Sequence, residues 1–245
     1  MELQGKRALV TGGGKGMGAA IAKRLAEEGA DVVLTYSASK EPAEKVAEYI
    51  RALGRKSEAV SADSRDAAQI KAAVARAGEL LGGIDIVVNN AGVFRWGMIE
   101  ELSIEDFDDS ISVNFRSAFV TAKEAMEFMP DGGRIVFIGS NLASRAHFPG
   151  LAAYSSTKAA LSGLAHALGR ELGPRGITAN AIHPGSTNTD MNPADAPDAA
   201  MKVAAAARQE FIETTEIADL IVFLSSEKGR SISGADLVID NGANA

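Results

Sequence analysis

Short apolar segments alternate with longer segments that favour helices from one end of the chain to the other. Residues 84–88 are apolar on both faces of an extended strand, which is typical of the central strands of parallel sheets. Strands are expected at residues 6–11, 29–36, 57–60, 84–88, 134–140, 176–182 and 235–240, and helices at 19–28, 42–53, 66–81, 103–129, 154–173 and 217–224.

The alternation contains no linker, repeat or low-complexity block, so it predicts one α/β domain over residues 1–245. The expected architecture is a single-domain Rossmann-type doubly wound parallel sheet of about seven strands flanked by helices. A segment rich in Pro, Asp and Ala, at about residues 190–211, is expected to form a mobile substrate lid with short helical pieces.

Composition excludes several classes of function. The chain has 25 Lys and Arg against 32 Asp and Glu, a net charge of −7, so it offers no basic field for nucleic acid or an anionic membrane. No apolar run approaches the roughly 18 residues that span a bilayer. The absence of Cys excludes disulfides, thiolate metal sites and a cysteine nucleophile. The amino terminus lacks the pattern of an export signal, so a cytoplasmic location is expected.

A glycine-rich turn lies between the first strand and the first helix. Strand, glycine turn and helix form the arrangement that binds a dinucleotide pyrophosphate, because glycines permit positive φ and let N–H groups approach the phosphates. A flexible loop is the alternative. The spacing does not match a triphosphate-binding loop, since Gly16 rather than Ser or Thr follows Lys15. The expected cofactor contacts in this turn are Gly12, Gly14, Lys15, Gly16, Met17 and Gly18.

The second strand ends at Tyr36 and is followed by Ser37, Ser39 and Lys40. An NAD-binding fold normally places an Asp or Glu there to bind the adenosine ribose. The missing carboxylate removes repulsion against a 2′-phosphate, which these hydroxyls, Lys15 and Lys40 can bind. The pattern therefore favours NADP(H) over NAD(H), with a polar turn before the next helix as the alternative.

Further polar residues follow other strands, at the edge where doubly wound sheets bind ligands. Asp63 follows the third strand, next to Ser64, and can reach an adenine ring. Asn90, Ala91 and Gly92 follow the fourth strand. Asn and Gly also favour turns without any function, which is the alternative for these residues. The expected cofactor contacts at these strand ends are Asp63, Ser64, Asn90, Ala91, Gly92, Pro184, Gly185, Thr187 and Thr189.

Four residues are candidates for the chemistry. Tyr154 and Lys158 are four positions apart in a predicted helix, so their side chains lie on one helical face. Ser140 ends the fifth strand, which brings it to the same end of the sheet as Tyr154. Asn114 lies inside a predicted helix, where Asn is mildly unfavourable. Its side chain either bonds backbone or water inside a site or is partly exposed.

Lys158 alone does not lower the pKa of the phenol far enough for catalysis near neutral pH. Bringing a pKa from ~10 to near 7 takes roughly 4 kcal/mol. A unit charge about 5 Å away gives only ~3.3 kcal/mol at a dielectric constant of 20. The positive charge of an oxidised nicotinamide would supply the remainder, which predicts a lower pKa of Tyr154 in the cofactor complex than in the free protein.

Two other motifs carry no function. Ser155 and Lys158 match the Ser-x-x-Lys pattern of penicillin-recognising enzymes, but the chain has no Lys-Thr-Gly partner. His147, His166 and His183 lack any paired metal-ligand spacing, so no metal is predicted. His183 is expected to be a strand-end neighbour of the nicotinamide site.

Taken together, these motifs resemble the classical short-chain dehydrogenase/reductase family over essentially the whole chain. The match is specific because the motifs occur in the family's order. They are Thr11-Gly12-x-x-x-Gly16-x-Gly18, Asn89-Asn90-Ala91-Gly92, Asn114, Ser140, Tyr154-x-x-x-Lys158 and Pro184-Gly185. The spacing from Ser140 to Tyr154 departs by one residue from the commonest one, and the last strand ends in Asp-Asn-Gly where the family often has Asp-Gly-Gly.

The resemblance implies hydride transfer between NADP(H) and a carbonyl or secondary alcohol. It implies that Tyr154 delivers the proton and that Ser140 holds the substrate oxygen. Lys158 would bond the nicotinamide ribose and stabilise the phenolate, and Asn114 would hold a relay water. Helices in the positions of 103–129 and 154–173 pair between subunits in the family, which implies a homotetramer.

The most similar branch is that of 3-oxoacyl-carrier-protein reductases. That branch includes a protein reported to bind cyclic di-GMP, so a nucleotide-binding regulatory protein on the same fold is the alternative function. The substrate itself is a small molecule whose pocket is lined by hydrophobic residues, although core or subunit packing explains these equally well. The candidate lining residues are Phe94, Trp96, Leu142, Phe148 and Met191.

Overall fold

The computed structural model describes residues 1–245 and contains one sheet of seven parallel strands. The spatial order is β3-β2-β1-β4-β5-β6-β7, which confirms the predicted doubly wound α/β architecture. The order reverses between β1 and β4, and ligands of such sheets bind in the crevice at that point. The strands are β1 (Arg7–Val10), β2 (Asp31–Tyr36), β3 (Ser57–Ser61), β4 (Ile86–Asn89), β5 (Arg134–Ile138), β6 (Thr178–Pro184) and β7 (Asp236–Ile239).

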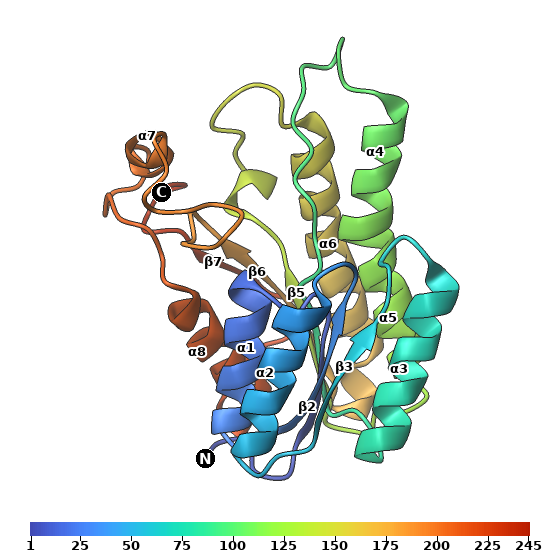
Figure 1. Ribbon diagram of the computed structural model, residues 1–245. Coiled ribbons are helices and arrows are strands. Elements are labelled where there is room, and N and C mark those ends of the chain that lie inside the picture. The colour runs from blue at the N-terminus through green and yellow to red at the C-terminus, as the bar shows by residue number, and fades with distance from the viewer.

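Helices cover both faces of the sheet (Figure 1). One layer packs against the face that carries Val10 and Val88, and the other against the face that carries Leu9 and Val87. The first layer consists of α1 (Gly16–Glu27), α2 (Lys40–Ala52) and α8 (Thr214–Ser225). The second consists of α3 (Ala67–Leu81), α5 (Ser117–Ala125) and α6 (Ala152–Glu171).

Successive residues of the central strands enter opposite cores. Val88 of β4 belongs to the α1 side and Val87 to the α5 side, and neither is exposed. Side chains of a strand alternate between its faces, so a strand covered by helices on both sides needs apolar residues at consecutive positions. This requirement explains the uninterrupted apolar segments of the sequence.

The predicted helix over residues 103–129 is divided. It consists of α4 (Ile104–Ile111), a π-helical turn (Ser112–Arg116) and α5, and it begins where Ser103 Oγ accepts a hydrogen bond from the Asp106 amide at 3.0 Å. A π turn holds one extra residue per turn and often marks a functional site. Here it carries Asn114.

Three chain segments rise beyond the carboxyl ends of the strands (Figure 1). One connects β4 to α4, one connects β5 to α6, and the third contains α7 (Ala199–Val203), which lies beyond the ends of β6 and β7. Apart from α7, the segment 190–211 contains turns and an isolated bridge from Thr189 to Asn192. None of the helices combines the length and the apolar character required to cross a membrane.

Candidate active site

The glycine turn after β1 is held in one shape by contacts that leave no room for larger residues. Gly12 has a φ of +64°, which other residues rarely adopt. A Cβ on Gly18 would lie 2.2 Å from the Gly12 carbonyl oxygen, so the first turn of α1 packs directly on the loop. Asn90 secures the same loop, because its amide nitrogen Nδ2 donates to the carbonyls of Thr11 and Gly12 at 3.0 and 3.1 Å. The turn therefore presents its backbone to a ligand at the start of a helix.

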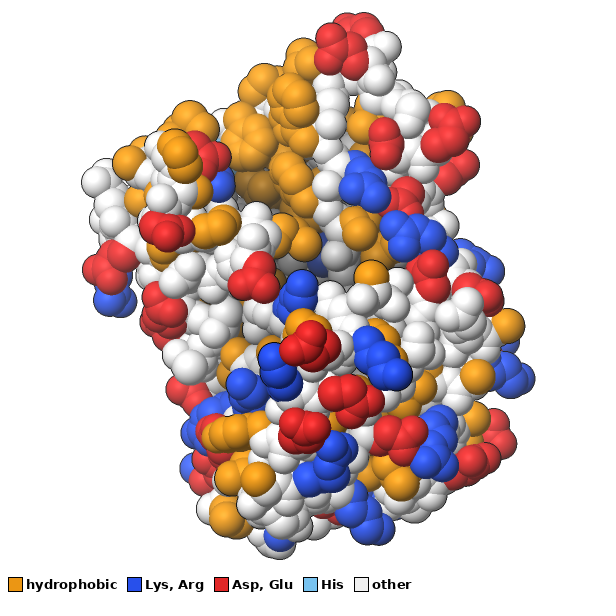
Figure 2. Space-filling model, in the orientation of Figure 1, with side chains coloured by type: hydrophobic (Ala, Val, Ile, Leu, Met, Phe, Trp, Pro, Cys, Tyr) orange, Lys and Arg blue, Asp and Glu red, His pale blue; other side chains and the backbone are white.

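A cleft of about 380 Å³ runs along the carboxyl ends of the strands. Figure 2 shows the hollow, bordered on one side by hydrophobic side chains. Most of the predicted cofactor residues line it, together with two of the predicted catalytic residues. They are Gly12, Lys15, Gly16, Met17, Gly18, Tyr36, Ser37, Asp63, Ser64, Asn90, Ala91, Gly92, Tyr154, Lys158 and Thr189.

The remaining predicted cofactor residues lie outside the lining of the cleft. A Cβ on Gly14 would lie 3.1 Å from the Cβ of Ala43, so Gly14 allows the turn to approach α2. Ser39 and Lys40 form the start of α2. Of the other three, Pro184 is the last residue of β6, and Gly185 and Thr187 follow it.

Sequence reasoning missed Arg65, which lines the adenosine side of the cleft next to Ser64. Its guanidinium group forms ion pairs with Asp109 at 2.6 Å and Asp63 at 3.2 Å and is 45% exposed. The sequence did contain a signal for Arg65, because a cationic residue directly follows the predicted cofactor residues Asp63 and Ser64. The two carboxylates balance the charge of Arg65 in this structure, so the guanidinium is available to a phosphate only through its exposed part.

Tyr154 lies in the first turn of α6 and is partly buried against Phe94, with the ring centroids 4.9 Å apart. Burial raises the pKa of Tyr154, and a hydrogen bond with the Ser140 side chain partly opposes this effect. Ser140 Oγ also accepts a hydrogen bond from the Leu142 amide at 3.2 Å, which orients it. The structure thus brings the predicted pair of hydroxyls together.

Lys158 lies one helical turn after Tyr154, with its Nζ 5.9 Å from the centroid of the tyrosine ring. It is 4% exposed, and its Nζ donates to the Ile138 carbonyl oxygen at 2.7 Å. Burial lowers the pKa of Lys158 to about 8. The ammonium group is therefore held at the end of β5 in a nearly dry environment, where its charge acts over several ångströms.

Asn114 is 1% exposed, so of the two alternatives for this residue the structure shows the side chain that bonds backbone and not partial exposure. Its Oδ1 accepts from the Val93 amide at 2.8 Å, and its Nδ2 donates to the Val93 carbonyl at 3.0 Å and to Thr157 Oγ1 at 3.1 Å. A Cβ on Gly92 would lie 3.3 Å from both Asn114 Oδ1 and Lys158 Nζ. Asn114 and Lys158 therefore face the same point beside the cleft.

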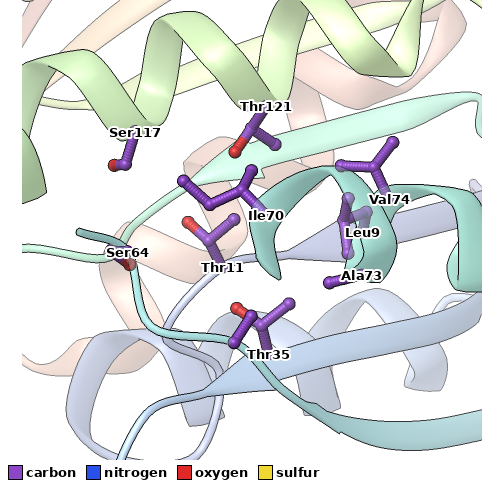
Figure 3. A pocket seen from close by; sticks show the side chains of 10 residues that line it. Leu9, Thr11, Thr35, Ser64, Ile70, Ala73, Val74, Ser117 and Thr121 are labelled. Carbon is purple, nitrogen blue, oxygen red and sulfur yellow. The ribbon is translucent and has the colours of Figure 1, made fainter. Parts of the chain in front are cut away.

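A second, much smaller cavity lies behind the glycine turn, between β1, β2, α3 and α5 (Figure 3). Hydroxyl side chains surround it, namely Thr11, Thr35, Ser64, Ser117 and Thr121. Thr11 Oγ1 accepts from the Ala91 amide and Thr35 Oγ1 from the Gly12 amide, at 3.1 and 3.2 Å. A volume of about 10 Å³ gives room for about one water molecule, so this cavity serves the structure of the turn rather than a ligand.

The fold, the glycine turn and the Tyr154–Lys158 pair are typical of a nucleotide-binding oxidoreductase. Comparison with known proteins identifies the family. The chain belongs to the short-chain dehydrogenase/reductase family and is an oxidoreductase. Residues 12–244 match the family described as enoyl-(acyl carrier protein) reductase. This match confirms the family resemblance predicted from the motifs.

Similar proteins cover the whole chain. A short-chain dehydrogenase from Burkholderia cenocepacia J2315, solved in complex with NADP, is 50% identical with a TM-score of 0.98, and 100% of each chain is covered. A blue fluorescent protein from a metagenomic library, solved with NADPH, is 44% identical with a TM-score of 0.98 and covers 100% of each chain. The cyclic-di-GMP-binding biofilm dispersal mediator protein of Escherichia coli K12 is 37% identical, and 98% of each chain is covered.

Proposed function

We propose that the protein is an NADP(H)-dependent carbonyl reductase that also catalyses the reverse oxidation of a secondary alcohol. One observation carries the proposal: Tyr154, Ser140, Lys158 and Asn114 meet at the carboxyl edge of the sheet, beside the cleft that follows the glycine turn. Four side chains from three separate segments have no structural need to meet there. Their functional groups match the requirements of proton transfer to a carbonyl oxygen.

The cleft fits the proposed cofactor in its backbone and in its charge. Five of the seven residues from Gly12 to Gly18 are glycines, which leave the backbone open next to the start of α1, and Lys15 adds a positive charge. No carboxylate ends β2 at Tyr36, and Arg65 lies on the same side. The absence of a carboxylate at the end of β2 favours a 2′-phosphate, whereas the charge of Arg65 is balanced by Asp63 and Asp109. The Burkholderia cenocepacia relative with NADP and the metagenomic relative with NADPH support this choice.

When bound, the cofactor supplies or accepts a hydride at the carbonyl carbon. The residues of the chain bind the carbonyl oxygen of the substrate and transfer its proton. Ser140 Oγ orients the substrate oxygen, and Tyr154 donates a proton to it in reduction and removes that proton in oxidation. Lys158 stabilises the phenolate by its charge. The side chain of Asn114 is engaged by Val93 and Thr157, so a relay water would bind the main-chain carbonyl of Asn114.

The substrate proposed here is an apolar carbonyl compound. Phe94 packs on Tyr154, and exposed hydrophobic side chains lie on all three segments above the sheet. Trp96 and Met191 are 56% and 70% exposed, and Phe148 is 47% exposed. An apolar patch of this kind on a soluble enzyme is typical of a binding surface. A substrate with an extended hydrophobic body would cover these side chains while its carbonyl reaches Tyr154.

Three further expectations belong to the proposal. The segment 190–211 would close over the substrate as a lid, since Met191 at its start lines the cleft. Four copies of the chain would associate through α4–α5 and α6. Light scattering of the purified protein would measure the mass of this assembly. A cytoplasmic location would be tested by cell fractionation.

The test is NADPH oxidation against a panel of aliphatic and aromatic ketones, with wild type and Tyr154→Phe compared. The expected result is a loss of at least about a hundredfold in kcat, because general acid catalysis contributes that much or more. Tyr49→Phe is the matched control, since Tyr49 lies on α2 and bonds Glu27. Equal rates for wild type and Tyr154→Phe would refute the catalytic role.

Binding of cyclic di-GMP is a second candidate, supported by the name of the Escherichia coli relative. The phosphates of such a ligand would compete for the glycine turn and Lys15. A titration of the free protein with cyclic di-GMP, followed by NADPH, distinguishes the candidates. Binding of cyclic di-GMP that excludes NADPH, in a protein without reductase activity, would favour the regulatory function.

A further inference from the structure

His183 contacts the main chain next to the proposed catalytic serine. It belongs to β6, and its side chain is only 6% exposed. Its Nδ1 lies 3.0 Å from the Ser140 carbonyl oxygen and 3.3 Å from the Ser140 amide nitrogen. A Cβ on Gly139 would lie 2.5 Å from His183 Nδ1, so only glycine at position 139 leaves space for the ring. The imidazole is thus packed directly against the end of β5.

The His183 ring replaces a main-chain hydrogen bond between β5 and β6. The hydrogen bonds that join β5 to β6 end with the Gly139 amide, which donates to the Ile182 carbonyl at 2.7 Å. One residue later, the Ser140 amide meets the His183 ring. A buried N–H group needs an acceptor, and here a side chain of β6 supplies it. The proton on Nδ1 therefore decides which main-chain group of Ser140 the ring bonds: the amide when Nδ1 is bare, and the carbonyl oxygen when Nδ1 carries a proton.

The other ring nitrogen is fixed by β7 and α6. His183 Nε2 lies 2.9 Å from Asp236 Oδ1 and 3.2 Å from Ser162 Oγ, and Asp236 Oδ2 lies 2.8 Å from Nε2 of His166, which is 52% exposed. Burial raises the pKa of Asp236, but hydrogen bonds with His183, Ser162 and His166 outweigh it and hold the pKa below the usual value. A carboxylate only accepts hydrogen bonds. Asp236 therefore holds a proton on Nε2, so that Nδ1 accepts from the Ser140 amide at 3.3 Å, beside the Ser140 carbonyl oxygen at 3.0 Å.

We propose that His183, with its tautomer set by Asp236, is a positioning residue that holds the main chain of Ser140 and so aims the Ser140 hydroxyl at Tyr154 and the substrate oxygen. The inference rests on the proposed function. If the proton moved to Nδ1, the ring would lose the hydrogen bond from the Ser140 amide and would donate to the Ser140 carbonyl oxygen instead, which would shift the main chain of Ser140. The reaction would then proceed with a displaced serine hydroxyl, while the cofactor cleft would be unchanged.

Asp236→Asn tests the role of the tautomer with almost no change in size. The new amide group can donate to Nε2 of His183 and so favours the proton on Nδ1. The expected result is a kcat for ketone reduction lowered about tenfold, as for one weakened hydrogen bond near the reacting atoms, with the Kd of NADPH unchanged. Nitrogen NMR of histidine-labelled protein should place the His183 proton on Nε2 in wild type and on Nδ1 in the variant. His166→Gln is the control, expected within about twofold of wild-type kcat because it leaves the His183–Asp236 pair intact.

Replacement of the ring gives a second measurement. His183→Asn places an amide oxygen near the position of Nδ1 and should retain more kcat than His183→Ala or His183→Gln. Equal losses in all three variants would reduce the role to packing and overturn the proposal. If these variants do not fold, Asp236→Asn decides alone, and a kcat equal to wild type refutes the role.

Tyr154→Phe separates this proposal from the proposed function. An inactive Tyr154→Phe beside a fully active Asp236→Asn would reject the positioning role of His183 and leave the reductase assignment in place. A fully active Tyr154→Phe would reject the reductase chemistry itself.

Discussion

Removal of the Lys158 charge should raise the pKa of Tyr154 in the cofactor complex. Lys158 Nζ lies 5.9 Å from the centroid of the tyrosine ring. At an effective dielectric constant of about 20, a unit charge at that distance stabilises the phenolate by about 3 kcal/mol, or about 2 pKa units. In Lys158→Met the pKa of Tyr154 should therefore rise by about 2 units.

The assay is the pH dependence of kcat/KM for oxidation of a secondary alcohol at saturating NADP⁺, which requires the phenolate. The acidic limb of the profile should move about 2 pH units upward in Lys158→Met. Lys23→Met is the control, because Lys23 lies 5.1 Å from the centroid of the Tyr49 ring at the protein surface. An acidic limb that stays in place, with a rate reduced equally at every pH, would show that Lys158 acts by binding alone.

The same variant should be more stable than wild type when no cofactor is bound. Burial lowers the pKa of Lys158 from 10.5 to about 8, so keeping it charged at neutral pH costs about 3 kcal/mol. The lost hydrogen bond to Ile138 offsets about 1 kcal/mol of this. The unfolded state binds more protons between pH 8 and 10.5, so wild-type stability rises with pH there, and the advantage of Lys158→Met should shrink. Urea unfolding at pH 7 and at pH 10.5 measures both values.

Three other substitutions test the cleft. Tyr36→Asp places a carboxylate at the end of β2, so the Kd of NADPH in a fluorescence titration should rise at least about tenfold while NADH binds more tightly. Gly18→Ala sets a Cβ 2.2 Å from the Gly12 carbonyl oxygen, so the loop must shift, and thermal melts should show a lower Tm and no stabilisation by NADPH. Asn114→Ala leaves the buried amide and carbonyl of Val93 without partners, at a cost of about 1–3 kcal/mol, and should lower kcat. Wild-type values in any of the three would contradict the role assigned to that residue.

Features set by neighbouring residues could be predicted from the sequence. The glycine turn follows from the chain between β1 and α1, and the shared face of Tyr154 and Lys158 follows from helical spacing. The strands followed from apolar segments because burial on both faces requires them. The unusual position of Asn114 was also visible, since a helix has little use for a buried Asn.

Features that depend on distant neighbours could not be predicted. The π turn at Asn114 accompanies two hydrogen bonds to Val93, a residue 21 positions earlier in another segment. His183 was expected beside the nicotinamide site, but its partners Ser140 and Asp236 are known only when β5, β6 and β7 are placed side by side. The spacing of these residues along the sequence does not show which strands are neighbours in the sheet.

The end of β5 joins these separate contacts into one scaffold. Its last residue, Ile138, accepts the hydrogen bond of Lys158, Gly139 gives space to the His183 ring, and the Ser140 hydroxyl lies beside Tyr154. Three consecutive residues thus set the ammonium, the imidazole and the hydroxyl relative to one another. The Gly139 amide between them bonds the Ile182 carbonyl of β6 at 2.7 Å, so all three groups are held to the sheet at one place. The buried charge of Lys158 destabilises the free protein, and the same rigid strand end keeps that charge where the phenolate of Tyr154 needs it.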